Sequence, residues 1–264
     1  MPTHRGTRFG EAQPDLNEAE LDQQNEIHVF LLSGQSNMKG RAPIDLKPTI
    51  NPNIIFFHST ECKWYIARDP IHALGTPDLI DGNDNAGTGP GISFANHLIK
   101  NSSIKTIALI PTAVGGAPID SFSKEGNCYL RSLELCKKGL EALGPKASLK
   151  GILWLQGESD SSEERYVSYE QKLHNLVDRY RKDLNSNMLP LIACTIGSFI
   201  YKENFKHSKK VNEVLMNLPN HKKNTLCIDA LDLDGHIGDF LHYDENAQFE
   251  IGKRYANAYL DNFN

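Results

Sequence analysis

The sequence has few of the features that mark a membrane, metal-binding or nucleic-acid-binding protein. No run of about 18 apolar residues occurs in it, so no membrane-spanning helix is predicted. The five cysteines lack CxxC pairs and zinc-ligand spacing, and their odd number argues against a full disulfide framework. A net charge of −5 offers no general attraction to nucleic acid or to an anionic membrane, so we expect neither as a partner.

The N-terminal segment also lacks the apolar stretch of a secretion signal. Residues 1–25 are polar and mostly acidic, and we expect them to form a disordered tail. Residues 26–264 show no shift in composition that would mark a linker, so they are expected to form a single domain. Together these features predict a cytoplasmic location and leave the oligomeric state open.

Short apolar runs alternate with amphipathic stretches along the rest of the chain. Strands are predicted at 29–32, 106–110, 151–155, 189–195 and 225–228, and helices at 91–100, 127–143, 163–184, 208–218 and 245–260. This order is typical of right-handed βαβ units on a parallel sheet. The predicted fold class is therefore α/β, a three-layer α/β/α sandwich around a central, mostly parallel sheet of five strands.

Ser36 is the first candidate for a reactive residue. The buried strand Val29–Leu32 is followed at once by Ser-Gly-Gln-Ser-Asn, in which Gly34 permits a tight turn into a helix. Open α/β sheets bind ligands at this carboxyl edge of the strands, and a helix N-terminus there favours a developing negative charge. Ser36 is thus placed as an acyl-transfer nucleophile; the alternative is that Ser36 or Asn37 only caps the helix.

Two later turns contain further polar groups suited to such a site. Gly115 and Gly116 follow the strand 106–110 and can present backbone N–H groups to a ligand. Gln156 follows the strand 151–155, where its neutral side-chain amide could donate to an oxyanion. Glu158 remains ambiguous, because it could order Gln156 or a histidine, bind a substrate hydroxyl, or simply be solvated.

The segment after the last strand supplies a candidate base. Asp239 and His242 are three residues apart, so one turn of chain can place the carboxylate on one ring nitrogen and leave the other free for Ser36. His236 is a rival base, since it is flanked by Asp234 and Asp239. We favour His242.

Cofactor signatures are weak or absent. Neither GxGxxG nor GxxxxGK[ST] occurs, which argues against a flavodoxin-like nucleotide-binding or phosphate-binding module. The run 81–85 superficially resembles a calcium loop but lacks Gly at its sixth position and Glu at its twelfth. No metal and no organic cofactor are expected.

Five motifs, in order, resemble those of one hydrolase superfamily. They are LLSGQSNMKGR, GTGPGISFANHL, PTAVGGAPIDSF, ILWLQGESD and GDFLHYDENAQFEIGKRYANAY. The sequence resembles the SGNH hydrolases, and among them the carbohydrate acetylesterases of carbohydrate esterase family six, which include sialate O-acetylesterase-like and acetylxylan esterase-like proteins. The resemblance covers nearly all of residues 27–260.

The resemblance implies a role for each candidate residue. Ser36 would be the nucleophile, His242 the general base and Asp239 its orienting carboxylate. The oxyanion hole would comprise the backbone N–H groups of Ser36 and Gly115, with Gly116 as the fallback, and the side chain of Gln156. The residues expected to bind substrate or support these groups are Gln35, Asn37 and Glu158.

The function that follows is a serine esterase that removes a short acyl group, most simply acetyl, from a carbohydrate or related alcohol. Its partner would be a small-molecule or glycan ester. Two alternatives stay open: a non-catalytic carbohydrate-binding protein on the same fold, and a general short-chain or lipase-like carboxylesterase. The loops 38–53 and 68–90 are where acyl-chain and sugar preference would be set.

Overall fold

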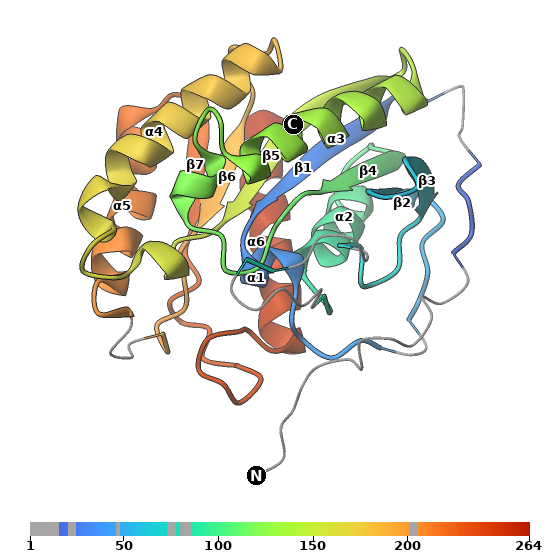
Figure 1. Cartoon of the computed structure of the whole chain (residues 1–264). Helices are drawn as coiled ribbons and strands as arrows, with labels where there is room; N and C mark the ends of the chain where they lie inside the picture. Colours follow the sequence, from blue (N-terminus) through green and yellow to red (C-terminus); the bar gives the residue numbers. More distant parts are fainter. Residues whose placement is uncertain (1–15, 21–24, 46–47, 73–77, 80–85, 201–204) are drawn as a thin grey trace.

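A seven-stranded sheet forms the centre of the molecule. The computed structural model describes residues 16–20, 25–45, 48–72, 78–79, 86–200 and 205–264 (Figure 1). The strand order is β3-β2-β4-β1-β5-β6-β7, and every neighbouring pair except β2 with β3 runs parallel. The strands are β1 (Ile27–Gly34), β2 (Ile54–His58), β3 (Lys63–Ile66), β4 (Thr106–Pro111), β5 (Ala147–Leu155), β6 (Leu191–Cys194) and β7 (Thr225–Ile228).

Helices cover both faces of this sheet, which gives the three layers (Figure 1). One face carries α2 (Pro90–Lys100) and α6 (Glu245–Phe263), which pack on each other and on the sheet. The other face carries α3 (Asn127–Leu143), α4 (Tyr166–Asp183) and α5 (Ser208–His221). Three shorter helices, α1 (Ser36–Lys39), η1 (Ile119–Phe122) and η2 (Glu158–Asp160), lie in the connections at the carboxyl edge.

The side chains of β1 divide between the two hydrophobic cores. Val29 and Leu31 belong to the core under α3, α4 and α5, whereas Phe30 and Leu32 belong to the core under α2 and α6. All four are completely buried because the central strand of a parallel sheet has helices on both sides. Phe30 also packs edge-on against Phe94 of α2, with ring centroids 4.8 Å apart.

The predicted α/β/α class is confirmed, but the strand count of five is wrong. The apolar run at 54–57 is β2, a parallel neighbour of β4. β3 is an antiparallel edge strand of four residues, too few for an alternation of polar and apolar residues to be recognised in the sequence. The remaining predicted elements are present, with ends that differ by a few residues.

Part of the predicted N-terminal tail contacts the sheet. Glu18 forms an isolated antiparallel bridge with Tyr65, and the Ala19 N–H donates to the Trp64 carbonyl at 3.0 Å. Residues 16–20 therefore extend the sheet beyond β3. The rest of the predicted tail, apart from Asn25, lies outside the described residues.

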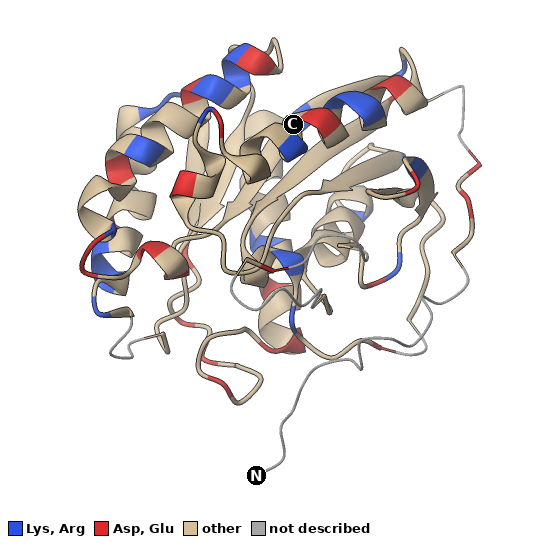
Figure 2. Cartoon of the chain, viewed as in Figure 1, with Lys and Arg blue, Asp and Glu red and all other residues tan. Residues whose placement is uncertain are grey.

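Charged side chains of both signs are distributed over the helices. Lys and Arg alternate with Asp and Glu along α3 and α4, and neither sign forms a continuous band in this view (Figure 2). None of the described helices has the length and apolar character needed to cross a membrane.

Gly34, at the end of β1, permits a close approach of β1 to β5. Its φ of +138° is unfavourable for other residues, and a Cβ there would lie 2.1 Å from the Leu155 carbonyl oxygen of β5. The next residue, Gln35, donates its N–H to that same carbonyl at 2.9 Å. This contact fixes the position at which the chain leaves the sheet toward Ser36.

Replacing Gly34 should therefore be far more damaging than replacing a glycine with space around it. We expect Gly34→Ala to lower the free energy of unfolding by about 3 kcal/mol or more, from backbone strain and the collision with Leu155. Gly144 is the matched control, because it has φ +75° but a Cβ at this position would meet no atom within 4 Å. Gly144→Ala should cost about 1 kcal/mol. Urea unfolding of both variants tests this, and equal losses would contradict it.

Candidate active site

Ser36 is held at the carboxyl edge of the central strand. It is the first residue of α1, which has a single turn of four residues, and its exposed fraction is 4%. Such a short helix has little macrodipole, so α1 stabilises a negative charge at Ser36 less than a long helix would. What positions Ser36 is the end of β1 and its contact with β5.

A tight loop between β7 and α6 presents Asp239 and His242. Its two ends are joined by a bridge between His236 and Tyr243, and the Ile237 N–H donates to the His242 carbonyl at 3.0 Å. Asp239 Oδ1 accepts hydrogen bonds from the backbone N–H groups of Leu241 and His242, both at 2.9 Å. This turn directs the other carboxylate oxygen toward the His242 ring.

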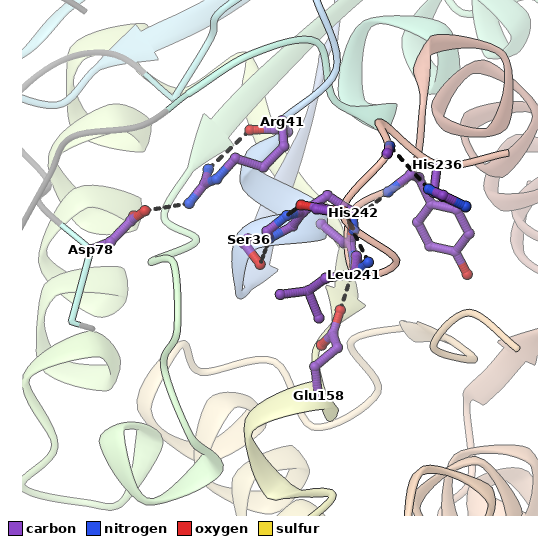
Figure 3. A network of polar contacts seen from close by, with 12 residues as sticks. Ser36, Arg41, Asp78, Glu158, His236, Leu241 and His242 are labelled. Carbon is purple, nitrogen blue, oxygen red and sulfur yellow. Dashed lines mark hydrogen bonds and ion pairs between the residues drawn. The ribbon is translucent and has the colours of Figure 1, made fainter. Parts of the chain in front are cut away.

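Ser36, His242 and Asp239 form one continuous hydrogen-bonded chain. His242 Nε2 lies 2.9 Å from Ser36 Oγ, and His242 Nδ1 lies 2.5 Å from Asp239 Oδ2. Since Asp239 occupies Nδ1, the neutral imidazole leaves Nε2 as the acceptor that faces the hydroxyl. Figure 3 shows the His242 ring directed at Ser36.

The carboxyl group of Asp239 stays ionised in this arrangement. Partial burial raises its pKa, but the hydrogen bonds from His242 and Leu241 and the charge of His242 outweigh burial and bring the pKa down to about 2. Asp239 is therefore a carboxylate throughout the range in which a histidine can act as a base.

His236, the rival base, is engaged elsewhere. Its Nδ1 accepts the Gly238 N–H at 3.0 Å, and its ring packs against Phe240 and Phe199, with centroids 4.2 and 5.4 Å away. The structure therefore brings His242 to Ser36 and places His236 at the base of the loop (Figure 3).

Asn37 joins three segments that are far apart in the sequence. Its Nδ2 donates to Glu158 Oε1 at 2.6 Å and to the Leu241 carbonyl at 3.1 Å, and its Oδ1 accepts the Tyr243 N–H at 3.1 Å. The two backbone groups lie on either side of His242. Asn37 is completely buried, and it therefore fixes the position of the loop that carries His242 relative to α1.

Glu158 is buried and not solvated. Its Oε1 is bonded to Asn37, while Oε2 is enclosed and has no hydrogen-bond partner in the described part of the chain. Burial is the main cause that raises the pKa of Glu158, opposed by the Asn37 bond and the nearby His242. The observed contact indicates a supporting role for Glu158, which holds α1 through its hydrogen bond with Asn37.

The backbone N–H of Gly115 has a hydrogen-bond acceptor that the sequence did not indicate. Its N–H donates to Asp78 Oδ1 at 3.0 Å, and the Asp78 carboxylate also binds Lys39, at 3.0 Å, and Arg41. In this arrangement the Gly115 N–H is not free to bind an oxyanion. Lys39 and Arg41 stand within the first motif, but nothing near Asp78 in the sequence indicated the pairing.

Gln156 also has other partners. It is completely buried, and its Nε2 donates to Asp160 Oδ2 at 2.5 Å and to the Ala117 carbonyl at 3.1 Å. Asp160 Oδ2 in turn accepts the Ile119 N–H at 2.7 Å, so this group fastens the glycine turn to η2. The structure thus does not bring the Gln156 amide to Ser36, because both of its N–H groups are used behind the site.

A cavity of about 240 Å³ opens above Ser36 and His242. Its lining comprises Gln35, Ser36, Arg41, Asp78, Gly115, Gly116, Glu158, Ser159, Phe205, Leu241 and His242. Asp239 and Asn37 are not part of the lining, and they hydrogen-bond to residues 241–243. A second cavity of about 440 Å³ lies between α2, α6 and neighbouring loops, and it contains none of the predicted site residues.

Metal ligands do not cluster in the described residues: no group of three or more His, Cys, Asp or Glu side chains there could hold an ion. The segment 81–85, considered above as a calcium loop, lies outside the described residues. The chemistry that the cavity offers is that of a hydroxyl next to a histidine and a carboxylate.

Comparison with known proteins identifies the family of the chain. Residues 26–261 match the model of the carbohydrate esterase, sialic acid-specific acetylesterase family. The chain belongs to this family. A probable carbohydrate esterase of Arabidopsis thaliana is 32% identical over 253 residues, which cover 89% of this chain and 91% of the relative.

Solved structures show the same relationship. An Arabidopsis thaliana protein superposes with a TM-score of 0.78 at 30% identity, covering 90% of this chain and all of that one. NanS superposes with a TM-score of 0.69 at 17% identity, covering 90% of this chain and 97% of NanS, which shows a shared fold. As a member of the sialic acid-specific acetylesterase family, the protein is a carboxylic ester hydrolase that acts on carbohydrates.

Loss of Asn37 should affect both stability and activity. Asn37→Ala would leave buried groups on Glu158, Leu241 and Tyr243 unpaired, at a cost of about 2 to 4 kcal/mol in the free energy of unfolding. The loosened histidine loop should lower kcat for ester hydrolysis on the order of 100-fold. Exposed Asn217 is the control, and Asn217→Ala should change stability by less than about 0.5 kcal/mol. Thermal unfolding and initial rates measure both effects; an unchanged kcat would contradict the positioning role.

Proposed function

We propose that this protein is a serine esterase that removes short acyl groups, most simply acetyl, from a carbohydrate hydroxyl. The observation that carries the proposal is the hydrogen-bonded chain from Ser36 through His242 to Asp239. The arrangement of hydroxyl, imidazole and carboxylate is the one that acyl-transfer enzymes on unrelated folds share. Membership of a carbohydrate esterase family supports the same chemistry.

In the proposed mechanism, Ser36 Oγ attacks the ester carbonyl while His242 Nε2 takes its proton. Asp239 holds the ring and stabilises the imidazolium that forms. Backbone N–H groups in the cavity bind the negative oxygen of the tetrahedral intermediate. His242 then protonates the leaving alcohol, and water attacks the acyl-enzyme in a second round to release the acid.

The size of the cavity favours a short acyl group. Its volume of about 240 Å³ lies below the 300 to 1,000 Å³ typical of small-molecule sites. Leu241 and Phe205 provide apolar contacts for an acyl methyl, whereas Arg41, Asp78 and Ser159 provide polar contacts for a hydroxylated alcohol. The description of the matched family makes O-acetylated sialic acid the first substrate class to test.

The first test is the nucleophile. A fluorophosphonate probe should label the wild type and fail to label Ser36→Ala, and p-nitrophenyl acetate hydrolysis should disappear in the same variant. Acetate release from O-acetylated sialic acid, acetylated xylan and small acetylated glycosides then identifies the alcohol. A wild type that is inactive on every ester in this panel would favour a non-catalytic carbohydrate-binding protein.

The second test separates the two histidines. We expect His242→Ala to lower kcat by roughly 10³-fold or more, because Ser36 loses its base. His236→Ala is the matched control from the same loop, and its kcat should stay within about tenfold of wild type. Rates on p-nitrophenyl acetate decide the matter, and the reverse order of the two losses would assign the base to His236.

The third test concerns Asp239. Its pKa of about 2 is below the ordinary 3.8. The stabilisation that the Asp239 anion gives to the folded site is therefore fully present above pH 4 and is lost only as the pH falls toward 2. Asp239→Asn should therefore lower kcat by roughly 10³ to 10⁴-fold across pH 5 to 9, since an amide cannot stabilise the imidazolium. Recovery of the wild-type rate at any pH in this range would contradict the assignment of Asp239 as the carboxylate that orients His242. The pH profile of kcat is the measurement.

A general short-chain carboxylesterase is the second candidate, because the cavity is suited to the acyl group without specifying the alcohol. Rates on acetate, butyrate and octanoate esters of one alcohol, and on acetates of sugars and simple alcohols, distinguish the two. A carbohydrate esterase should discriminate among alcohols as well as acyl chains.

A further inference from the structure

A second cavity, larger than the catalytic one, has no part in the proposed reaction. Its volume is about 440 Å³, against about 240 Å³ for the cavity above Ser36. It lies between α2, α6 and the loops that follow α1 and β3, and the two helices pack side by side on one face of the sheet (Figure 1). The volume is within the range of roughly 300 to 1,000 Å³ that is typical of small-molecule sites. The chemistry of its lining shows which class of ligand it suits.

Six charged side chains line this cavity, three of each sign. They are Arg68, Lys100, Lys253, Asp45, Asp69 and Glu245. Burial raises the pKa of Asp69 to about 7, and the charge of Glu245 contributes to the increase. Even with Asp69 protonated, the lining carries only one net positive charge. A lining so nearly balanced gives little general attraction to a multivalent anion or to a cation.

Hydrogen-bonding groups of both kinds are left open in the lining. The side chains of Lys100 and Glu245 form no hydrogen bond or ion pair with a described residue, which leaves a donor and an acceptor. Asn96 Oδ1 accepts from Asn51 at 3.2 Å, while Asn96 Nδ2 has no acceptor in the described part of the chain. Asp69 Oδ1 is enclosed and also lacks a partner there. Because a hydroxyl group both donates and accepts, a ligand with several hydroxyls can pair with all of these groups.

Phe249 of α6 gives the cavity an apolar surface. It lines the cavity, is 39% exposed, and its ring packs on no aromatic ring within the described ranges. Its backbone carbonyl accepts the Ser93 hydroxyl of α2 at 2.7 Å, which fixes its position where the two helices meet. A sugar ring has an apolar C–H face that can pack on such a ring, and hydroxyls at its rim that reach polar groups. An acyl chain would instead leave the charged groups of the lining unpaired.

A pair of hydrogen-bonded segments connects this cavity with the catalytic one. Ala42 forms an isolated antiparallel bridge with Thr88, and the Gly40 carbonyl accepts the Gly87 N–H at 3.0 Å. Arg41 lines the catalytic cavity, whereas Thr88 lines the second cavity. The same two segments therefore contribute to both cavities, which places the cavities close enough for one glycan of several sugar units to occupy both.

We propose that the cavity between α2 and α6 is a second carbohydrate-binding site, which takes an uncharged sugar unit of the glycan whose ester is cleaved at Ser36. Phe249 would pack on the sugar ring, and Lys100, Glu245 and Asn96 would bind its hydroxyls. The part of the inference that concerns the esterified glycan rests on the proposed function. Binding of the sugar itself does not, because this cavity contains none of the reacting groups.

Titration calorimetry with ester-free sugars tests the site directly. The probes are four uncharged tetrasaccharides, made of xylose, glucose, mannose and galactose units. We expect at least one to bind the wild type, and Phe249→Ala to weaken that binding about tenfold by removing the ring face. Phe249→Tyr keeps the ring and should bind within about threefold of wild type. The matched control is Leu130→Ala, since Leu130 is 49% exposed on α3, at the opposite face of the sheet, and its loss should leave binding unchanged.

Three results would overturn the assignment. The first is that none of the four tetrasaccharides binds at about 10 mM. The second is that binding is as strong in Phe249→Ala as in the wild type, which would place the sugar elsewhere. The third is that tetragalacturonate or spermine, an anion and a cation, binds this cavity more tightly than the uncharged sugars do.

Kinetics then connect the second cavity with catalysis. With the acetylated form of a tetrasaccharide that binds, Phe249→Ala should raise KM about tenfold and keep kcat within about twofold, as expected for lost uniform binding. With p-nitrophenyl acetate, which is too small to reach both cavities, both constants should stay within about twofold of wild type. An equal change on the two esters would indicate a structural defect and contradict the proposal. Failure of the proposed function looks different: the wild type would hydrolyse neither ester, while the calorimetric loss in Phe249→Ala would remain.

Discussion

The hydrogen bond between Ser36 Oγ and His242 Nε2 joins residues 206 positions apart, and the geometry of the site depends on it. Neither residue is placed by its neighbours alone. Ser36 is set by the close approach of β1 to β5 at Gly34, and His242 is set by the loop before α6. Asn37 fastens the two together through the backbone groups on either side of His242. The reactive pair is therefore a product of sheet packing and one buried amide.

Around this pair, polar groups divide into those that hold the scaffold and those that face the cavity. Asp78, with Lys39 and Arg41, holds the N–H of Gly115, and Gln156 with Asp160 holds the turn that follows. An N–H group has one proton to donate, so an N–H that already has an internal acceptor cannot also donate to a substrate. The hydrogen bonds that stabilise these turns therefore also show which donors remain available for catalysis.

Much of the fold was accessible from the sequence because its signals are local. The run Val29–Leu32 is apolar and contains a β-branched and an aromatic residue, which indicates a buried strand. Helical periodicity predicts α3 and α6 nearly to their ends. β3 was missed because four residues at an antiparallel edge have no period to detect. Its pairing with β2 and with residues 16–20 arises only when the chain is folded.

By itself, the sequence determined the α/β class, the sites of Ser36, Asp239 and His242 at the ends of strands, and the resemblance to carbohydrate acetylesterases. These depend on residue type and spacing along the chain. Tertiary structure decided which of two histidines meets Ser36, that Asp78 covers Gly115, and that Gln156 turns inward while Gln35 faces the cavity. A hydrogen-bonding side chain can point to several partners, and which one it meets depends on segments brought together only by packing.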